Sequence, residues 1–260
     1  MMRIRITVSR GINGTFPAEI VPSEKTAGTV WRMRGTIDRE KNKKAAGFLL
    51  LFLSICVMGM VWYREEAWQT MGKAEEVKKV ALTFDDGPNP DYTGMLLDGL
   101  RERNTVATFF LLGAECEKYP ELVKKIAEDG HLIGVHAYEH VNLANLTDEA
   151  AVRQVDETNR IIHELTGIYA EYIRPPYGCW KCNLDYKTTM IEVLWDVDPL
   201  DWKTDNADVI AERVVSDVEE NDIILLHDAS ESSVLAAFQI VDRLREEGYT
   251  FVTVEELLLE

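Results

Sequence analysis

From residue 77 to the C-terminal end, short apolar runs typical of strands alternate with longer segments of helical spacing. The predicted strands cover residues 80–85, 107–112, 131–136, 172–174, 192–197, 222–226 and 251–254. The predicted helices cover residues 92–103, 120–128, 147–167, 207–218 and 233–247. Apolar strands that alternate with helices are typical of a parallel sheet covered by helices. The pattern fits either a closed barrel or an open doubly wound sheet, and periodicity alone does not choose between them.

The net charge of −17 is distributed unevenly along the chain. Residues 1–44 hold 10 Lys and Arg against 4 Asp and Glu, a net charge of +6, and residues 45–63 hold no charge. Residues 64–260 hold 18 against 41, a net charge of −23. Because contacts to phosphate need clustered Lys and Arg, we expect no nucleic-acid partner, and no obligate protein partner is evident.

The uncharged segment, residues 45–63, is nineteen residues long. As a helix it would span about 28 Å, close to the hydrocarbon thickness of a bilayer. Basic residues precede it, and Trp62 and Tyr63 end it in the manner of an interfacial anchor, so the N-terminus is expected in the cytoplasm. A buried core helix and a cleaved signal peptide are the alternatives, but no small-x-small cleavage pattern follows the run.

We therefore expect a single-pass protein of the cell membrane with an extracellular C-terminal portion. Its expected parts are a basic cytoplasmic tail with little structure (1–44), a transmembrane signal anchor (45–63), a linker (64–79) and a folded domain (80–258).

Polar residues stand at the carboxyl ends of the predicted strands: Asp85, His136, Arg174, Asp198 and His227. Carboxyl ends of parallel strands meet at one edge, where the sites of α/β proteins are assembled. Each short motif is weak by itself. The sequence Asp-Asp-Gly-Pro often forms only a turn, and a His-x-x-x-His pair is common by chance, although on a helix both imidazoles would share one face, as a metal pair must.

Five motifs occur in a fixed order: Thr83-Phe-Asp-Asp-Gly-Pro88, His136-x-x-x-His140, Arg174-Pro-Pro-Tyr177, Asp198-x-x-Asp-Trp202 and Leu225-x-His227. Together they resemble the polysaccharide deacetylases, the NodB-homology domain of carbohydrate esterase family 4, over about residues 78–258. The resemblance implies a catalytic α/β domain, a distorted (β/α) barrel with about seven strands. In this chain one transmembrane helix would precede it.

The resemblance also implies a metal site. Asp86, His136 and His140 would bind a divalent ion, with zinc favoured and cobalt or manganese as alternatives. The ion would lower the pKa of a water molecule and polarise the acetyl carbonyl. The second motif of the family has Ser or Thr after its first histidine, where this chain has Ala137. Loss of such a supporting group typically costs about 10–100-fold in metal affinity or activity.

The remaining motif residues would perform proton transfer and substrate binding. By the resemblance, Asp85 is the general base held by Arg174, and His227 is the general acid oriented by Asp201. The substrate-binding residues would be Tyr177, whose backbone N–H stabilises the oxyanion, and Trp202 and Leu225, which wall a pocket for the acetyl methyl group.

The expected activity is hydrolytic deacetylation of an N-acetylated cell-surface polysaccharide, with the N-acetylglucosamine of peptidoglycan as the favoured substrate. N-acetylmuramic acid, chitin-type oligomers and an exported N-acetylglucosamine polymer are alternative substrates. The alternative functions are an O-acetyl esterase on xylan-type polymers, or a surface glycan-binding protein that keeps the fold without catalysis. An intracellular metal hydrolase would require residues 45–63 to stay out of the membrane.

All four cysteines and two of the five histidines lie outside these motifs, with Cys56 in the apolar run and Cys116 in the C-terminal portion. Cys179 and Cys182 form a lone Cys-x-x-Cys pair, which is weak evidence for zinc and is expected to be a surface disulfide or two free thiols. His131 and His163 match no motif and are expected to have structural or surface roles.

Overall fold

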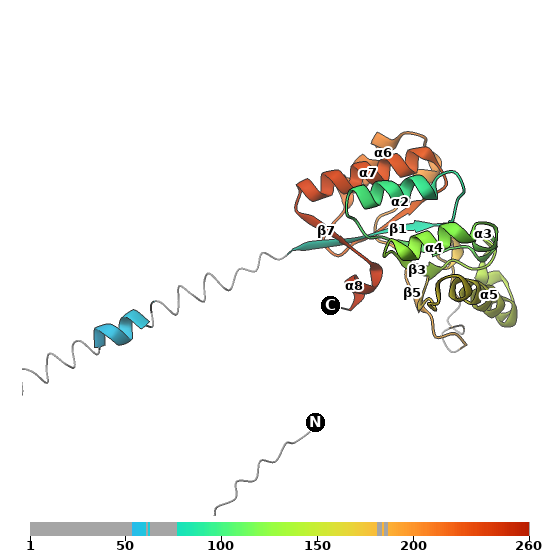
Figure 1. Ribbon diagram of the computed structural model, residues 1–260, viewed down its shortest axis with the longest axis horizontal. Helices are drawn as coiled ribbons and strands as arrows, with labels where there is room; N and C mark the ends of the chain where they lie inside the picture. Colours follow the sequence, from blue (N-terminus) through green and yellow to red (C-terminus); the bar gives the residue numbers. More distant parts are fainter. Residues whose placement is uncertain (1–53, 61, 63–76, 181–183, 185–186, 260) are drawn as a thin grey trace, which may run out of the picture. The chain divides into compact units, whose positions relative to one another are not determined.

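The computed structural model describes residues 54–60, 62, 77–180, 184 and 187–259, and the chain divides into two compact units, residues 1–70 and 71–260. In the first unit, residues 54–60 and 62 are helical. The predicted tail, the rest of the predicted anchor and most of the linker lie outside the described residues (grey in Figure 1). Among the residues that are described, no helix is both long enough and apolar enough to cross a membrane.

The second unit is built on one parallel sheet, as the alternation of strands and helices predicts. Its strands, within the described residues, are β1 Lys78–Asp85, β2 Thr108–Leu111, β3 Leu132–Val135, β4 Tyr172–Ile173, β5 Ile191–Glu192, β6 Ile223–His227 and β7 Tyr249–Val252. Their order is β5-β4-β3-β2-β1-β6, and β7 also pairs with β1. The last six residues of β1 are all buried, because neighbours cover both faces, and this explains why residues 80–82, which point alternately to the two faces, are all apolar.

The predicted strand at 192–197 is wrong for most of its length. Only Ile191–Glu192 pairs with β4, after which the chain leaves regular pairing. The N–H groups of Asp196 and Val197 then donate to the carbonyl of Ile223, and the N–H of Leu225 donates to the carbonyl of Val197. The segment after β5 thus returns to β6 through an isolated bridge, and the sheet is a distorted half-barrel.

Within the described residues, helices pack on both faces of the curved sheet: the C-terminal helix packs on one face and the other helices pack on the opposite face. They are α2 Thr93–Glu102, α3 Gly113–Lys118, α4 Pro120–Glu128, α5 Asp148–Thr166, α6 Ala207–Asp217, α7 Glu231–Glu246 and α8 Val254–Leu258. Five were predicted, with Gly167 confirmed as the left-handed cap of α5. The short helices α3 and α8 were not. The last predicted strand, at 251–254, ends early because Thr253 forms a capping box with Glu256 that starts α8.

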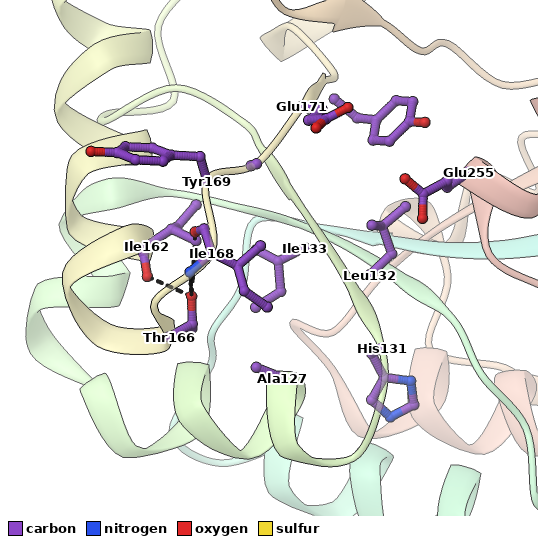
Figure 2. A pocket seen from close by; sticks show the side chains of 12 residues that line it. Ala127, His131, Leu132, Ile133, Ile162, Thr166, Ile168, Tyr169, Glu171 and Glu255 are labelled. Carbon is purple, nitrogen blue, oxygen red and sulfur yellow. Dashed lines mark hydrogen bonds between the residues drawn. The ribbon is translucent and has the colours of Figure 1, made fainter.

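A cavity of about 250 Å³ lies where β3 and β4 begin, at the opposite end of these strands from their carboxyl termini (Figure 2). Apolar side chains such as Ile133 and Ile168 line it, and the Thr166 hydroxyl donates to the carbonyl of Ile162. His131, at its border, accepts the Ala107 N–H at Nδ1, and burial lowers its pKa to about 4. This fits the structural role expected for His131.

Candidate active site

The carboxyl ends of the parallel strands bring the polar motif residues together. Asp85 ends β1 and His227 ends β6, and the two are paired in register. His136 directly follows β3 and Arg174 directly follows β4, while the neighbouring pair Val135 and Ile173 is in register. Strand register therefore assembles four residues that are up to 142 positions apart in the sequence.

Asp86, His136 and His140 form a cluster that could hold a metal ion. One ligand atom from each residue lies within 4.8 Å of the others. Oδ1 of Asp86 lies 3.4 Å from Nε2 of His136 and 3.5 Å from Nε2 of His140. This buried oxygen has no hydrogen-bond partner among the described residues. Because an unpaired buried carboxylate oxygen is costly, its position between two ring nitrogens fits a cation.

The local hydrogen bonds and charges also suit a cation. Nδ1 of His136 donates to the carbonyl of Arg174 at 2.7 Å, which leaves the Nε2 lone pair directed at Asp86. Burial raises the pKa of Asp86, but the close approach of His136 and the charges of His140 and His227 outweigh it and lower the pKa. Burial also lowers the pKa of His140, which favours the neutral imidazole that metals bind.

The two histidines do not lie on a helix, in contrast to the simplest geometry for a His-x-x-x-His pair. Residues 136–140 form an irregular loop after β3, and the two imidazole centroids are 5.3 Å apart. Ala137, inside this loop, is fully buried and has a positive φ of 86°.

Arg174 holds Asp85 beside this cluster. Its Nη1 donates to Oδ1 of Asp85 at 2.8 Å and to the Thr83 hydroxyl at 2.6 Å. Its Nε and Nη2 donate to the carbonyls of Val193 and Leu194, where the sheet is irregular. The fully buried guanidinium therefore has two roles: it donates to carbonyls that the sheet leaves unpaired, and it fixes the Asp85 carboxylate.

Asp201 holds His227 on the other side of the cluster. Oδ1 of Asp201 lies 2.8 Å from Nδ1 of His227, while Oδ2 accepts the His227 N–H at 2.8 Å and the Ser233 hydroxyl at 2.7 Å. Burial lowers the pKa of His227, but Asp201, followed by Asp85 and Asp86, overcomes this and raises it to about 9. Because Nδ1 is engaged, Nε2 is the nitrogen left to exchange a proton.

The carboxylates and imidazoles described above line one cavity of about 660 Å³, whereas the fully buried Arg174 does not. Tyr177 and Trp202, more than 60% exposed, border it together with the buried Leu225. Tyr177 has a positive φ of 63°, and its ring meets that of His140 edge-on at 4.6 Å. Ring faces of this kind can stack on sugars, so the cavity is suited to a carbohydrate.

The sequence prediction missed several residues of this cavity. Trp195, Asp205 and Ser233 also line it. Ser233 could have been suspected from the Ser230-x-x-Ser233 pattern of a helix start, because Ser230 caps α7 through the Ser233 N–H. Trp195 and Asp205 carry no such signal, since the irregular segments that place them have no periodicity.

None of the described cysteines lines the cavity. Burial raises the pKa of Cys116 to about 12, so its thiol is unreactive at neutral pH. Cys179 forms no disulfide with another described residue, and Cys182 lies outside the described residues, so the expectation for that pair remains a prediction. His163 stacks on Tyr169 with 3.8 Å between ring centroids and does not line the cavity.

Comparison with known proteins gives matches over the second unit. The family model for polysaccharide deacetylase matches residues 72–193. The chain is 39% identical over 180 residues to the peptidoglycan-N-acetylmuramic acid deacetylase PdaC of Bacillus subtilis, covering 69% of this chain and 38% of PdaC. It is 38% identical over 203 residues to a peptidoglycan-N-acetylglucosamine deacetylase of Bacillus cereus, covering 75% of this chain and 74% of that protein.

The fold is similar to a solved structure as well. The structure of PdaC from Bacillus subtilis has a TM-score of 0.69 at 39% identity, covering 70% of this chain and 91% of that structure. The chain therefore spans well under half of the full length of PdaC, and nearly all of the part whose structure is solved.

Proposed function

Since this chain belongs to the polysaccharide deacetylase family, we propose that it is a metal-dependent hydrolase that removes acetyl groups from an N-acetylated polysaccharide. The favoured substrate is the N-acetylglucosamine of peptidoglycan, the sugar named for the relative from Bacillus cereus, whereas PdaC is named for N-acetylmuramic acid. The observation that carries the proposal is the cluster of Asp86, His136 and His140. It lies beside two residues able to transfer protons, Asp85 and His227, each fixed by an ion pair.

Asp86, His136 and His140 would hold the metal. Two imidazole nitrogens and one carboxylate, with further positions open, suit zinc, and cobalt or manganese are the alternatives. When bound, the ion would polarise the acetyl carbonyl and lower the pKa of a neighbouring water molecule.

Asp85 would act as the general base. Arg174 holds its Oδ1, so Oδ2 is the oxygen left to take a proton from the attacking water. The water oxygen forms a bond to the acetyl carbon, and the backbone N–H of Tyr177 donates to the oxygen on which negative charge develops.

His227 would act as the general acid. Its Nε2 proton passes to the sugar nitrogen as the C–N bond breaks, which releases acetate and a free amine. Asp201 keeps the imidazole cationic below about pH 9, so this proton is present at neutral pH. The apolar side chain of Leu225 and the ring of Trp202 would contact the acetyl methyl group and the sugar.

The N-terminal portion would place this activity at the cell surface. We propose that residues 45–63 span the cell membrane, with the basic residues 1–44 in the cytoplasm and the acidic C-terminal unit outside. Membrane fractionation together with protease treatment of whole cells tests this. Recovery of the protein in the soluble fraction, or protection of the C-terminal unit from protease, would contradict it.

Acetate release from a small panel of glycans tests the activity. The purified full-length chain with zinc should release acetate from N-acetylglucosamine oligomers or peptidoglycan, and less from O-acetylated xylan. Asp85→Asn and His136→Ala should each abolish most of this release, because they remove the base and a metal ligand. Unchanged release by both variants would contradict the mechanism, and glycan binding without any release would indicate a non-catalytic protein.

A further inference from the structure

The loop at residues 136–140 carries two of the three proposed metal ligands, yet it is neither helix nor strand. Such a segment lacks the repeating hydrogen bonds of a regular element, so its shape depends on neighbouring groups. Helices α3 and α5, which lie side by side, supply them (Figure 1).

Helix α3 holds the carbonyl groups of the loop. The N–H groups of Gly113 and Ala114, the first two residues of α3, donate to the carbonyls of Ala137 and Tyr138, each at 3.0 Å. These N–H groups have no partner inside their own helix, so the loop satisfies them.

Helix α5 holds the N–H groups of the loop through one side chain. Oε1 of Gln154 accepts the backbone N–H of Tyr138 at 3.0 Å and that of Glu139 at 2.8 Å. Both lone pairs of the amide oxygen are therefore used, and both donors lie between His136 and His140. The residue at position 137 has only a methyl group and, with φ at 86°, a conformation that alanine adopts at a cost. The loop thus depends on contacts from outside for its shape.

We propose that Gln154 is a positioning residue for the metal site. By fixing the Tyr138 and Glu139 peptides, it keeps Nε2 of both histidines directed at Asp86 before any ion binds. The proposal rests on the proposed function only in that the cluster binds a metal. It adds a residue that lies outside all five motifs.

Gln154→Met tests the proposal, because methionine keeps the length of the side chain and lacks the acceptor. We expect faster hydrogen exchange at the Tyr138 and Glu139 amides in the metal-free full-length chain, and a 10–100-fold loss of zinc affinity in competition with a chelator. Gln154→Glu retains an oxygen acceptor and should keep both exchange protection and zinc affinity near those of the parent.

Gln239→Met is the matched control. Gln239 donates to Asp208 on the exposed side of α6 and α7, away from the loop, so this variant should bind zinc like the parent. The proposal is overturned if Gln154→Met keeps parental amide exchange and zinc affinity. It is equally overturned if Gln154→Glu loses as much as Gln154→Met, since retaining the acceptor would then not matter.

Neither readout depends on acetate release, which separates this proposal from the proposed function. If the parent chain binds no zinc, the metal-dependent function fails, whereas amide exchange in the metal-free variants still shows whether Gln154 holds the loop.

Discussion

Replacing Asp201 with Asn would alter the proton on His227 while changing the shape of the site very little. In the parent, Oδ1 of Asp201 faces Nδ1 of His227, and Oδ2 accepts the His227 N–H and the Ser233 hydroxyl. The oxygen of an Asn amide can keep both contacts of Oδ2, which places the NH₂ group against Nδ1. Because an amide N–H only donates, Nδ1 must then accept, and the neutral imidazole is favoured.

The expected change in the pKa of His227 follows from the opposing effects of burial and of nearby carboxylates. Burial lowers its pKa, but Asp201 first, then Asp85 and Asp86, raise it from 6.5 to about 9. Loss of the nearest carboxylate should lower this pKa by about 2 units, which corresponds to about 3 kcal/mol. Since the folded-state pKa lies above the unfolded value, the pair stabilises the fold fully below pH 6.5, and this stabilisation is lost as the pH rises through about 9.

NMR titration of the His227 ring in the metal-free protein measures the pKa directly, and urea unfolding below pH 6.5 and above pH 9 measures the stability. Asp205→Asn is the control, because Asp205 lines the same cavity without an ion pair to His227. A His227 pKa in Asp201→Asn that stays within about half a unit of the parent would refute the reasoning. With zinc present, acetate release at neutral pH should fall by about 10²–10⁴-fold.

Three further predictions concern the supports of the site. Arg174→Met leaves Asp85 buried without its cation and should destabilise the fold by about 3–5 kcal/mol in urea unfolding at neutral pH; a loss below 1 kcal/mol would contradict this. Gly87→Ala places a Cβ 2.6 Å from Oδ2 of Asp228, so we expect about 1–3 kcal/mol of destabilisation in urea unfolding. Zinc binding at the adjacent Asp86 should also weaken. A variant as stable as the parent would contradict this, because it would show that the loop adapts. Burial raises the pKa of Asp228 from 3.8 to about 6. As the pH rises through this range, the metal-free parent should therefore lose about 3 kcal/mol of stability relative to Asp228→Asn. Parallel profiles of stability against pH for the two proteins would contradict the prediction.

Residues at regular strand ends could be placed from the sequence. Asp85, His136, Arg174 and His227 end or directly follow buried strands, and parallel pairing brings such positions to one edge. A sequence pattern shows where a strand ends, and the common edge then follows from geometry alone.

Residues in irregular segments could not be placed in this way. The apolar run at 192–197 has strand composition, but the carbonyls of Val193 and Leu194 accept from Arg174 instead of pairing in the sheet. Gln154 gives no signal either, because a glutamine on a helix is ordinary and its partners are backbone groups of a distant loop. Such contacts depend on tertiary packing, which local periodicity does not contain.

The central claim is that a metal held by Asp86, His136 and His140 is needed to remove acetyl groups. The most direct test is to strip the full-length chain of metal with a chelator and to follow acetate release from N-acetylglucosamine oligomers as zinc is added back. The account predicts that release is absent at first, rises with zinc and saturates at one ion per chain, and that His136→Ala does not respond. Release by the stripped chain, or an equal response of His136→Ala, would contradict it.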